Sequence, residues 1–151
     1  MEALIVDALR TPRGRGKSTG SLATVTPMEL ICHPLRALKE RHALETDSVD
    51  EVILGCVEPV GEQGGDIGRI AALMSGLGEG VPGIQINRFC SSGLDAINLA
   101  AAKIGSGQSD LVIGGGVESM SRISMGASGG AWATDPQIAS ALHFIPQGIS
   151  G

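Results

Sequence analysis

The sequence predicts an α/β fold in which a mostly parallel, mixed sheet carries helices on both of its faces. Short apolar runs alternate along the chain with longer amphipathic segments, a pattern typical of β-α-β units. Hydrophobic residues make up 42% of the chain and charged residues 18%, so there is enough apolar surface for a packed interior. Aromatic residues contribute only 2%, and we therefore expect aliphatic side chains to fill the core.

The N-terminal part is predicted to contain one strand and one helix. The apolar run over residues 3–9 is interpreted as a buried strand, and a glycine-rich loop follows it. A helix is expected to begin after Thr26, because Thr26, Pro27 and Glu29 match an N-cap, a first-turn proline and a capping box. Pro34 lies inside this helix and has no backbone N–H to donate, so we expect a kink or a break there.

The rest of the chain repeats strands and helices and then loses its periodicity. We expect strands over residues 51–57, 83–87 and 110–114, and helices over residues 67–74 and directly after Cys90. In a parallel sheet of this kind, the functional loops follow the carboxyl ends of the strands. Residues 118–151 are rich in Gly, Ser and Ala, and we interpret them as a long excursion from the sheet.

Charge, hydropathy and cysteine spacing exclude several classes of function. The net charge of −5 argues against a nucleic-acid surface, and no apolar run is long enough to cross a bilayer. Three cysteines without a C-x-x-C pair fit neither a zinc site nor a disulfide framework, so no metal site is expected. The chain opens directly on an apolar strand without a signal-peptide pattern, which makes the cytoplasm the expected location.

Cys90 is the strongest candidate for a reactive residue. It follows an apolar strand and precedes an alanine-rich helix, which Ser91 or Ser92 is expected to cap. A thiol at a helix N-terminus lies in the positive end of the helix dipole, and this field favours the thiolate. The competing interpretation is a small buried core residue, which suits Cys32 and Cys56 because both lie in apolar runs. Position within the chain leaves both interpretations open for Cys90.

Other candidate sites are weaker. Gly16-Lys17-Ser18 resembles the end of a phosphate-binding loop, but Thr11 stands where that motif needs its first glycine. The carboxylates of Glu58, Glu62 and Asp66 are interpreted as a solvated acidic loop rather than a metal site. The three histidines are interpreted as surface imidazoles without a catalytic role: His33, His42 and His143.

Four segments of the chain resemble the thiolase family of acyl-CoA C-acyltransferases. The run from Asn87 to Ile97 is similar to the motif that carries the family's acyl-enzyme cysteine. Arg10-Thr11-Pro12 is similar to the family's N-terminal segment, and Asp50 to Val57 is similar to its second strand. Gly114 to Ser121, with the sequence GGGVESMS, is similar to the segment that follows the cysteine helix in the family.

The resemblance implies a function in thiolytic cleavage of 3-ketoacyl-CoA, or in the reverse Claisen condensation of acetyl-CoA. Cys90 would be the nucleophile that forms the acyl-thioester, and its backbone N–H would be an oxyanion donor. Coenzyme A and acyl-CoA would be substrates, with no cofactor bound permanently; the residues that contact them stay unassigned. The family's histidine, N-E-A and second cysteine segments have no match here, so an N-terminal fragment that is inactive alone is expected.

The resemblance also implies an architecture and a state of assembly. The chain would form the first half of a two-fold repeated fold, with residues 1–117 as an incomplete α/β domain. Residues 118–151 would begin an inserted loop domain. A homodimer or homotetramer is expected, with self-association through residues 61–90.

Two alternatives remain at this level. A ketoacyl synthase is a related condensing enzyme that also carries a cysteine at a strand-to-helix turn, although Arg10-Thr11-Pro12 and Val117 to Ser121 favour a thiolase. The chain could also be a non-catalytic unit that acts in assembly or binding. The sequence of these 151 residues does not separate this last alternative from an enzyme fragment.

Overall fold

The computed structural model of the chain describes residues 2–143, 145 and 147–150. Its elements are α1 (Pro27–Arg41), β1 (Glu51–Gly55), the 3-10 helix η1 (Gly61–Gln63), α2 (Ile67–Met74), β2 (Gly83–Ile86), α3 (Ser92–Gly105), β3 (Val112–Gly116), α4 (Ala131–Thr134), α5 (Pro136–Ala141) and α6 (Gln147–Ser150). The expected helix over residues 67–74 has both predicted bounds. The three later strands are confirmed to within two residues at each end. None of the helices in the described part of the chain is long and apolar enough to cross a membrane.

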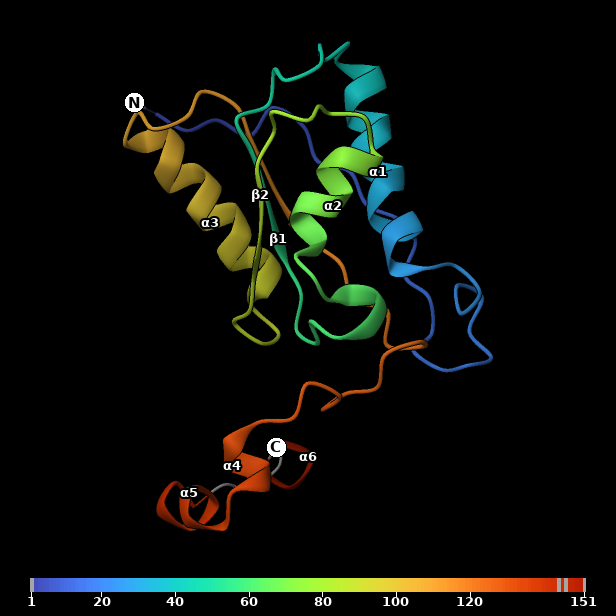
Figure 1. Cartoon of the computed structure of the whole chain (residues 1–151), viewed down its shortest axis with the longest axis vertical. Coiled ribbons are helices and arrows are strands. Elements are labelled where there is room, and N and C mark those ends of the chain that lie inside the picture. The colour runs from blue at the N-terminus through green and yellow to red at the C-terminus, as the bar shows by residue number, and fades with distance from the viewer. Residues whose placement is uncertain (1, 144, 146, 151) are drawn as a thin grey trace.

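The sheet has the order β2-β1-β3, and both of its pairings are parallel. In the central strand, Val52 pairs with Gly83 on one side and with Ile113 on the other. Helix α3 lies on one side of the strands, while α1 and α2 lie on the other (Figure 1). The predicted α/β class, with helices on both faces of the sheet, is therefore confirmed.

Alternation along β1 explains why each face of the sheet has its own core. All five residues of β1 are buried. Val52, Leu54 and the following Cys56 belong to the larger cluster, which includes residues of α1 and α2. Ile53 points to the opposite face and packs with Ala96 and Ala100 of α3. Successive side chains of a strand point to opposite faces, so the apolar run from Val52 to Leu54 is buried on both sides of the sheet.

Helix α3 packs close to the sheet because the strand positions that it contacts are glycines, which have no side chain. A Cβ built on Gly55 would lie 2.3 Å from the carbonyl carbon of Ser92, a distance that real structures do not show. A Cβ on Gly114 would lie 2.9 Å from the Cα of Ile97. The glycines of the sheet therefore determine how closely the start of α3 approaches the sheet. They also determine the position of the loop that precedes α3.

The beginning of α1 is confirmed as predicted. Thr26 Oγ1 accepts from the Glu29 N–H at 3.2 Å, and the Glu29 carboxylate accepts from the Thr26 N–H at 2.9 Å. Of the kink or break expected at Pro34, the break does not occur, because α1 runs as one helix from Pro27 to Arg41; the kink stays a prediction. Proline removes a single helical hydrogen bond, and the burial of Ile31 and Leu35 on either side of it stabilises the continuous helix.

The strand predicted over residues 3–9 is not formed. This segment has no strand in the structure, and Leu4, Ile5 and Val6 are 73%, 82% and 74% exposed. An apolar run becomes a strand only when a neighbouring strand takes up its backbone hydrogen bonds, and no described strand pairs with this one. Asp7 instead ties the segment to the end of α1, through Arg41 at 3.0 Å and His42 Nε2 at 2.7 Å.

The excursion after β3 is attached to the sheet domain by two carboxylates. The Glu58 carboxylate accepts from the Gly126 N–H, and from the Ser128 N–H at 2.8 Å and Ser128 Oγ at 2.6 Å. Glu62 binds the Arg122 guanidinium through two contacts of 2.5 and 2.6 Å. The excursion contains the short helices α4, α5 and α6 and extends away from the sheet (Figure 1).

Candidate active site

Cys90 lies in the loop that joins β2 to α3, at the carboxyl end of the sheet. β2 ends at Ile86 and α3 begins at Ser92, so the loop spans residues 87–91. The Cys90 side chain is exposed, whereas Cys32 and Cys56 are each 1% exposed. In Figure 1 this loop lies at the end of the sheet from which the excursion extends. Of the three thiols, Cys90 is the one that a reactant can reach in the folded chain.

The loop is held in an uncommon backbone conformation. Phe89, directly before Cys90, has a φ of 49°, in the left-handed region that non-glycine residues rarely occupy. The Asn87 side chain spans the turn: its Oδ1 accepts from the Phe89 N–H at 2.8 Å, and its Nδ2 donates to the Val57 carbonyl at 2.9 Å. The exit of β1 and the cysteine loop are therefore tied to one side chain.

The expected capping of α3 by a serine hydroxyl is wrong. Ser91 is the N-cap residue, but it makes no side-chain capping hydrogen bond. The Ser92 hydroxyl instead faces the loop: it accepts from the Arg88 N–H at 2.8 Å and donates to the Phe89 carbonyl at 2.6 Å. Ser92 is 3% exposed, so its hydroxyl makes buried contacts to the backbone that precedes the cysteine. A run of cysteine and two serines before a helix does not indicate which hydroxyl turns backwards.

Two contacts link the side chains around Cys90 to their surroundings. Arg88 Nε binds the Asp95 carboxylate at 2.8 Å, which neutralises the one acidic residue in the first turn of α3. The Phe89 ring stacks on Trp132 of α4, with centroids 4.8 Å apart and an interplanar angle of 25°. The excursion therefore reaches the cysteine loop through an aromatic pair separated by more than forty residues in sequence.

The two buried thiols lie in surroundings that suppress ionisation. Burial raises the pKa of the Cys32 thiol. Burial, together with the negative charge of Glu118, raises the pKa of the Cys56 thiol to about 12. The interpretation of Cys32 and Cys56 as core residues is confirmed by their position in the structure. A thiol that stays protonated at neutral pH is a poor nucleophile.

Gln63, which is buried, and Glu118, which is half-buried, form a hydrogen-bond network that the sequence analysis did not predict, although Glu118 lies in the GGGVESMS segment. The Gln63 amide donates to the Glu118 carboxylate at 2.7 Å and accepts from the Ser119 N–H at 2.6 Å. The other Glu118 oxygen accepts from the Val57 N–H at 2.6 Å. These contacts fix the backbone after β1 and after β3 to each other, at the same carboxyl end of the parallel sheet as the cysteine loop. Their partners lie up to sixty-one positions apart, so local pattern analysis cannot find them.

The acidic loop is more structured than the sequence indicated. Glu58 is 7% exposed, so its interpretation as solvated is wrong; a hydrogen bond from the Ser128 hydroxyl holds the pKa of its carboxyl below the usual range. Hydrogen bonding from Arg122 likewise lowers the pKa of Glu62, and the Asp66 carboxylate accepts from the Arg69 N–H at the start of α2. Within the described residues, His, Cys, Asp and Glu form no group of three or more that could hold a metal ion.

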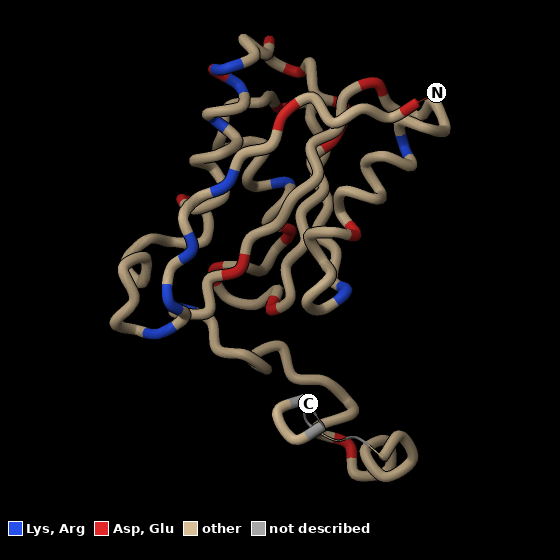
Figure 2. The backbone as a smooth tube through the Cα atoms, turned by 180° about the vertical axis from the view of Figure 1, so that it is seen from behind, with Lys and Arg blue, Asp and Glu red and all other residues tan. Residues whose placement is uncertain are grey.

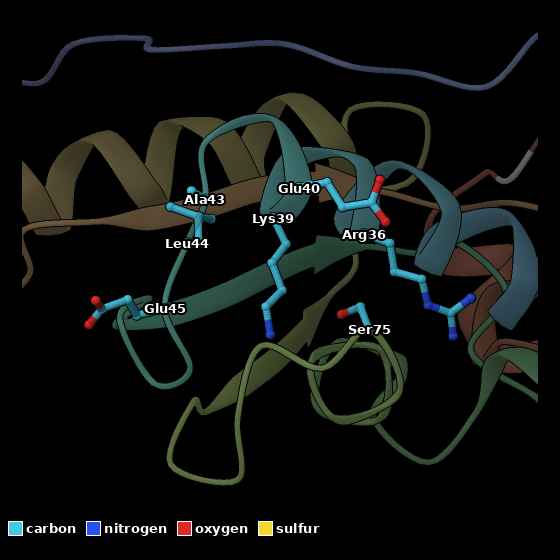
Figure 3. Close-up of a pocket in the computed structure, with 7 residues that line it drawn as sticks. All are labelled: Arg36, Lys39, Glu40, Ala43, Leu44, Glu45 and Ser75. Carbon is cyan, nitrogen blue, oxygen red and sulfur yellow. The ribbon is translucent and has the colours of Figure 1, made fainter.

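A pocket at the opposite end of the sheet is lined by cations whose hydrogen bonds to the backbone explain their position. It lies between the end of α1 and the end of α2 and is lined by Arg36, Lys39, Glu40, Ala43, Leu44, Glu45 and Ser75 (Figure 3). Arg36 donates to the Met74 carbonyl at 2.7 Å, and Lys39 donates to the Gly76 carbonyl. Both cations satisfy carbonyls at the C-terminus of α2, where positive charge is favourable. His33, His42 and His143 are exposed, as expected.

Comparison with known proteins decides the family. A family model described as "Thiolase, N-terminal domain" matches residues 3–142. The chain belongs to the thiolase family. The match covers the sheet, the cysteine loop and most of the excursion, and it names the thiolases rather than the related ketoacyl synthases.

Curated thiolases are identical to this chain at close to half of the aligned positions. The chain is 48% identical over 122 residues to a β-ketoadipyl-CoA thiolase of Pseudomonas knackmussii, which covers 80% of this chain and 30% of that protein. It is 46% identical over 139 residues to a β-ketoadipyl-CoA thiolase of Acinetobacter baylyi, covering 90% of this chain and 34% of the relative. The chain therefore spans about a third of the length of the thiolases it matches.

A solved structure supports the same fold. The acetyl-CoA acetyltransferase of Bacillus anthracis matches with a TM-score of 0.63 and 43% sequence identity. The superposition covers 68% of this chain and 26% of that one. This thiolase chain therefore has the α/β fold of the N-terminal thiolase domain, with the cysteine loop between β2 and α3.

Proposed function

We propose that this thiolase chain carries the acyl-accepting cysteine of an acyl-CoA C-acyltransferase. The observation that carries the proposal is the exposure of Cys90 at a strand-to-helix turn, in contrast to the two buried thiols. The turn is fixed by Asn87 and Ser92, so the thiol is presented at a defined place at the start of α3. The names of the relatives, which are thiolases of CoA esters, support the same chemistry.

In the proposed reaction, Cys90 forms and then releases an acyl-thioester. The Cys90 thiol loses its proton and attacks the keto carbon of a 3-ketoacyl-CoA. A sulfur–carbon bond forms, the bond between C2 and C3 breaks, and C2 takes up a proton, so that acetyl-CoA leaves. The thiol of a second coenzyme A then gives up its proton and attacks the same carbonyl carbon, which returns Cys90 to its free form. The reverse sequence condenses two molecules of acetyl-CoA.

We assign the Cys90 backbone N–H as a donor to the developing oxyanion. It immediately precedes the N-cap of α3, and backbone N–H groups at the start of a helix have no acceptor within the helix and can donate to an anion. Residues 1–151 contain no match to the family's other acid, base and oxyanion segments. The proposed outcome for the isolated chain is therefore acylation without turnover, with coenzyme A and acyl-CoA as substrates and no permanently bound cofactor.

The chain also supports proposals on domains, assembly and location. β3 ends at Gly116, which supports residues 1–117 as the α/β domain and 118–151 as the start of an inserted loop domain.

The outer edge of β2 pairs with no described strand, which supports self-association at this edge in a homodimer or homotetramer. Sedimentation of the chain as a monomer would contradict this proposal. Three free cysteines support a reducing compartment, and we propose the cytoplasm.

A short basic segment offers charge complementary to coenzyme A. Arg13, Arg15 and Lys17 are all exposed in the glycine-rich loop. Figure 2 shows Lys and Arg residues along this loop before α1. A local cluster of cations can bind phosphate despite a net charge of −5.

Incubation with acetoacetyl-CoA tests the proposed function. Intact-mass analysis is expected to show one acetyl group per chain, located on the Cys90 peptide, and the Cys90→Ser variant should stay unmodified. Enolate absorbance should show no continuing thiolysis. Absence of acylation in a chain that is folded by circular dichroism would contradict the proposal and favour a non-catalytic unit. Sustained, Cys90-dependent turnover would contradict the need for groups outside these residues.

A further inference from the structure

We propose that Asn87 and Ser92 act together as positioning residues that fix the orientation of the Cys90 backbone N–H. This inference deepens the proposed function, since it assigns residues to the oxyanion donor on which that function rests. Neither side chain needs to touch the substrate. Both act on the peptide groups on either side of Phe89, the residue that immediately precedes the cysteine.

Peptide planarity carries the argument. The Phe89 carbonyl and the Cys90 N–H belong to one peptide group, and in a trans peptide they point in opposite directions. The Phe89 carbonyl accepts from the Ser92 hydroxyl at 2.6 Å and from the Ser92 N–H at 2.9 Å. A carbonyl held by two donors from the first turn of α3 therefore directs the Cys90 N–H away from that turn.

Asn87 fixes the other side of the same residue. Its Oδ1 accepts from the Phe89 N–H at 2.8 Å, so the peptide groups before and after Phe89 are both held. This matters because Phe89 has a φ of 49°, and an unsupported non-glycine residue would relax towards negative φ. Relaxation would rotate the peptide group between Phe89 and Cys90, and the Cys90 N–H would turn with it.

The support extends into the buried part of the sheet domain. Asn87 Nδ2 donates to the carbonyl of Val57, and the Val57 N–H donates to Glu118 at 2.6 Å. Gln63, which is fully buried, holds the second oxygen of Glu118. The Asn87 side chain is thus anchored on the backbone at the exit of β1.

Comparison of two adjacent serines tests the inference. Ser92→Ala removes the hydroxyl that holds the Phe89 carbonyl, whereas Ser91→Ala removes a hydroxyl that makes no capping bond. Each variant is measured in two reactions of Cys90: acylation by acetyl-CoA, which needs an oxyanion donor, and alkylation by iodoacetamide, which does not. Ser92→Ala and Asn87→Ala are expected to slow acylation by about tenfold, a part of the loss seen when an oxyanion donor is removed.

The two reactions should respond differently. Alkylation is expected to change by less than about twofold, because the Cys90 side chain stays exposed and only its N–H is misdirected. Ser92→Thr, which keeps the hydroxyl, should restore acylation, and Ser91→Ala should leave both rates unchanged. Equal losses in both reactions, or equal effects of Ser91→Ala and Ser92→Ala on acylation, would overturn the inference.

A second measurement keeps the two proposals apart. If the unmodified chain is not acylated by acetyl-CoA, the proposed function fails. NMR relaxation of the Cys90 amide still decides the positioning role, because it needs no substrate. The inference expects a lower order parameter for this amide in Ser92→Ala and Asn87→Ala than in the unmodified chain and in Ser91→Ala. An unchanged order parameter in all variants would contradict it.

Discussion

Cys56 and Cys90 each follow a strand of the same parallel sheet, yet their surroundings differ completely. Cys56 comes directly after β1, and its N–H continues the ladder by donating to the Ile86 carbonyl at 3.0 Å. Its side chain therefore keeps the alternation of the strand and enters the larger core. Cys90 comes four residues after the end of β2, beyond a residue with positive φ. The distance from the strand and the turn at Phe89 decide that one thiol is buried and the other exposed.

The comparison shows that residue type and strand proximity do not make a thiol reactive. Burial, together with the negative charge of Glu118, raises the pKa of the Cys56 thiol to about 12. Cys90 is exposed at the start of a helix, and the acidic residue in the first turn is paired with Arg88. The carboxyl end of one sheet thus carries a protected thiol directly after the central strand β1 and an accessible thiol in the loop after β2.

The largest expected effect comes from a substitution that disrupts the packing of α3 on the sheet. Gly55→Val places side-chain atoms where the carbonyl carbon of Ser92 lies, within 2.3 Å of the new Cβ, so α3 must move. Urea unfolding is expected to show a loss of about 3 kcal/mol or more. Gly93→Ala is the matched control, because its Cβ would have 4.0 Å to the nearest atom. That variant should be neutral or stabilising by about 0.5 to 1 kcal/mol, as expected for alanine in a helix. Equal stability of both variants would contradict the packing of α3 on bare glycine.

The next effect concerns the buried thiol and high pH. Since the pKa of Cys56 is raised in the folded chain, its contribution is complete below the ordinary thiol pKa of 9.0 and is lost as pH rises towards 12. Above pH 9 the unfolded chain releases a proton that the folded chain keeps, and the free energy of unfolding should fall by about 1 kcal/mol per pH unit for this residue. Urea titrations at several pH values measure the slope, which should be shallower in Cys56→Ala. The same slope in both chains would contradict the burial of this thiol.

A smaller effect concerns the excursion and low pH. The pKa values of Glu58 and Glu62 are lowered, so their contribution to attachment is present above the ordinary value of 4.5 and is lost as pH falls through their folded values. Trp132 is the only tryptophan of the chain and stacks on Phe89, so its fluorescence reports this attachment. We expect its emission to shift to longer wavelength on acidification before the far-ultraviolet circular dichroism of the sheet domain changes. Arg122→Ala should move the fluorescence transition to higher pH. If the fluorescence and circular dichroism transitions occur at the same pH, the excursion does not detach before the sheet domain unfolds, and the prediction is contradicted.

The smallest expected effect tests whether Trp132 partly covers the loop. Removal of the aromatic stack in Trp132→Ala should raise the rate of Cys90 alkylation by about two- to fivefold, in line with the energy of such a stack. Cys56 should stay protected in this variant, because its core lies on the other face of the sheet from α3. A decrease in Cys90 alkylation would contradict a covering role for Trp132.

Local physics explains which parts of this fold could be predicted. The capping box at Thr26 and Glu29 and the apolar run from Val52 to Leu54 in β1 are determined within a few residues, and both were found. The run at Leu4 to Val6 has the same local character as β1, but a strand also needs a neighbour, which no local pattern supplies. Side-chain choices in loops were equally hidden, since either of two adjacent serines could have capped α3 and neither does.

The site itself was predictable only in part. The position of Cys90 between a strand and a helix follows from the sequence, and its exposure agrees with a reactive role. The contacts of Gln63 with Glu118 and of Phe89 with Trp132 join residues more than forty positions apart. Such pairs leave no periodicity, because they depend on how the elements pack rather than on the order of neighbouring residues.

Differential alkylation of the three cysteines tests the central claim most directly. The native chain is treated briefly with iodoacetamide and quenched, and the peptides that contain Cys32, Cys56 and Cys90 are quantified by mass spectrometry. We expect Cys90 to react at least about a thousandfold faster than the two buried thiols, which become accessible only through unfolding. In denaturant, all three should react at similar rates. Earlier labelling of Cys56 or Cys32 than of Cys90 in the native chain would contradict the account.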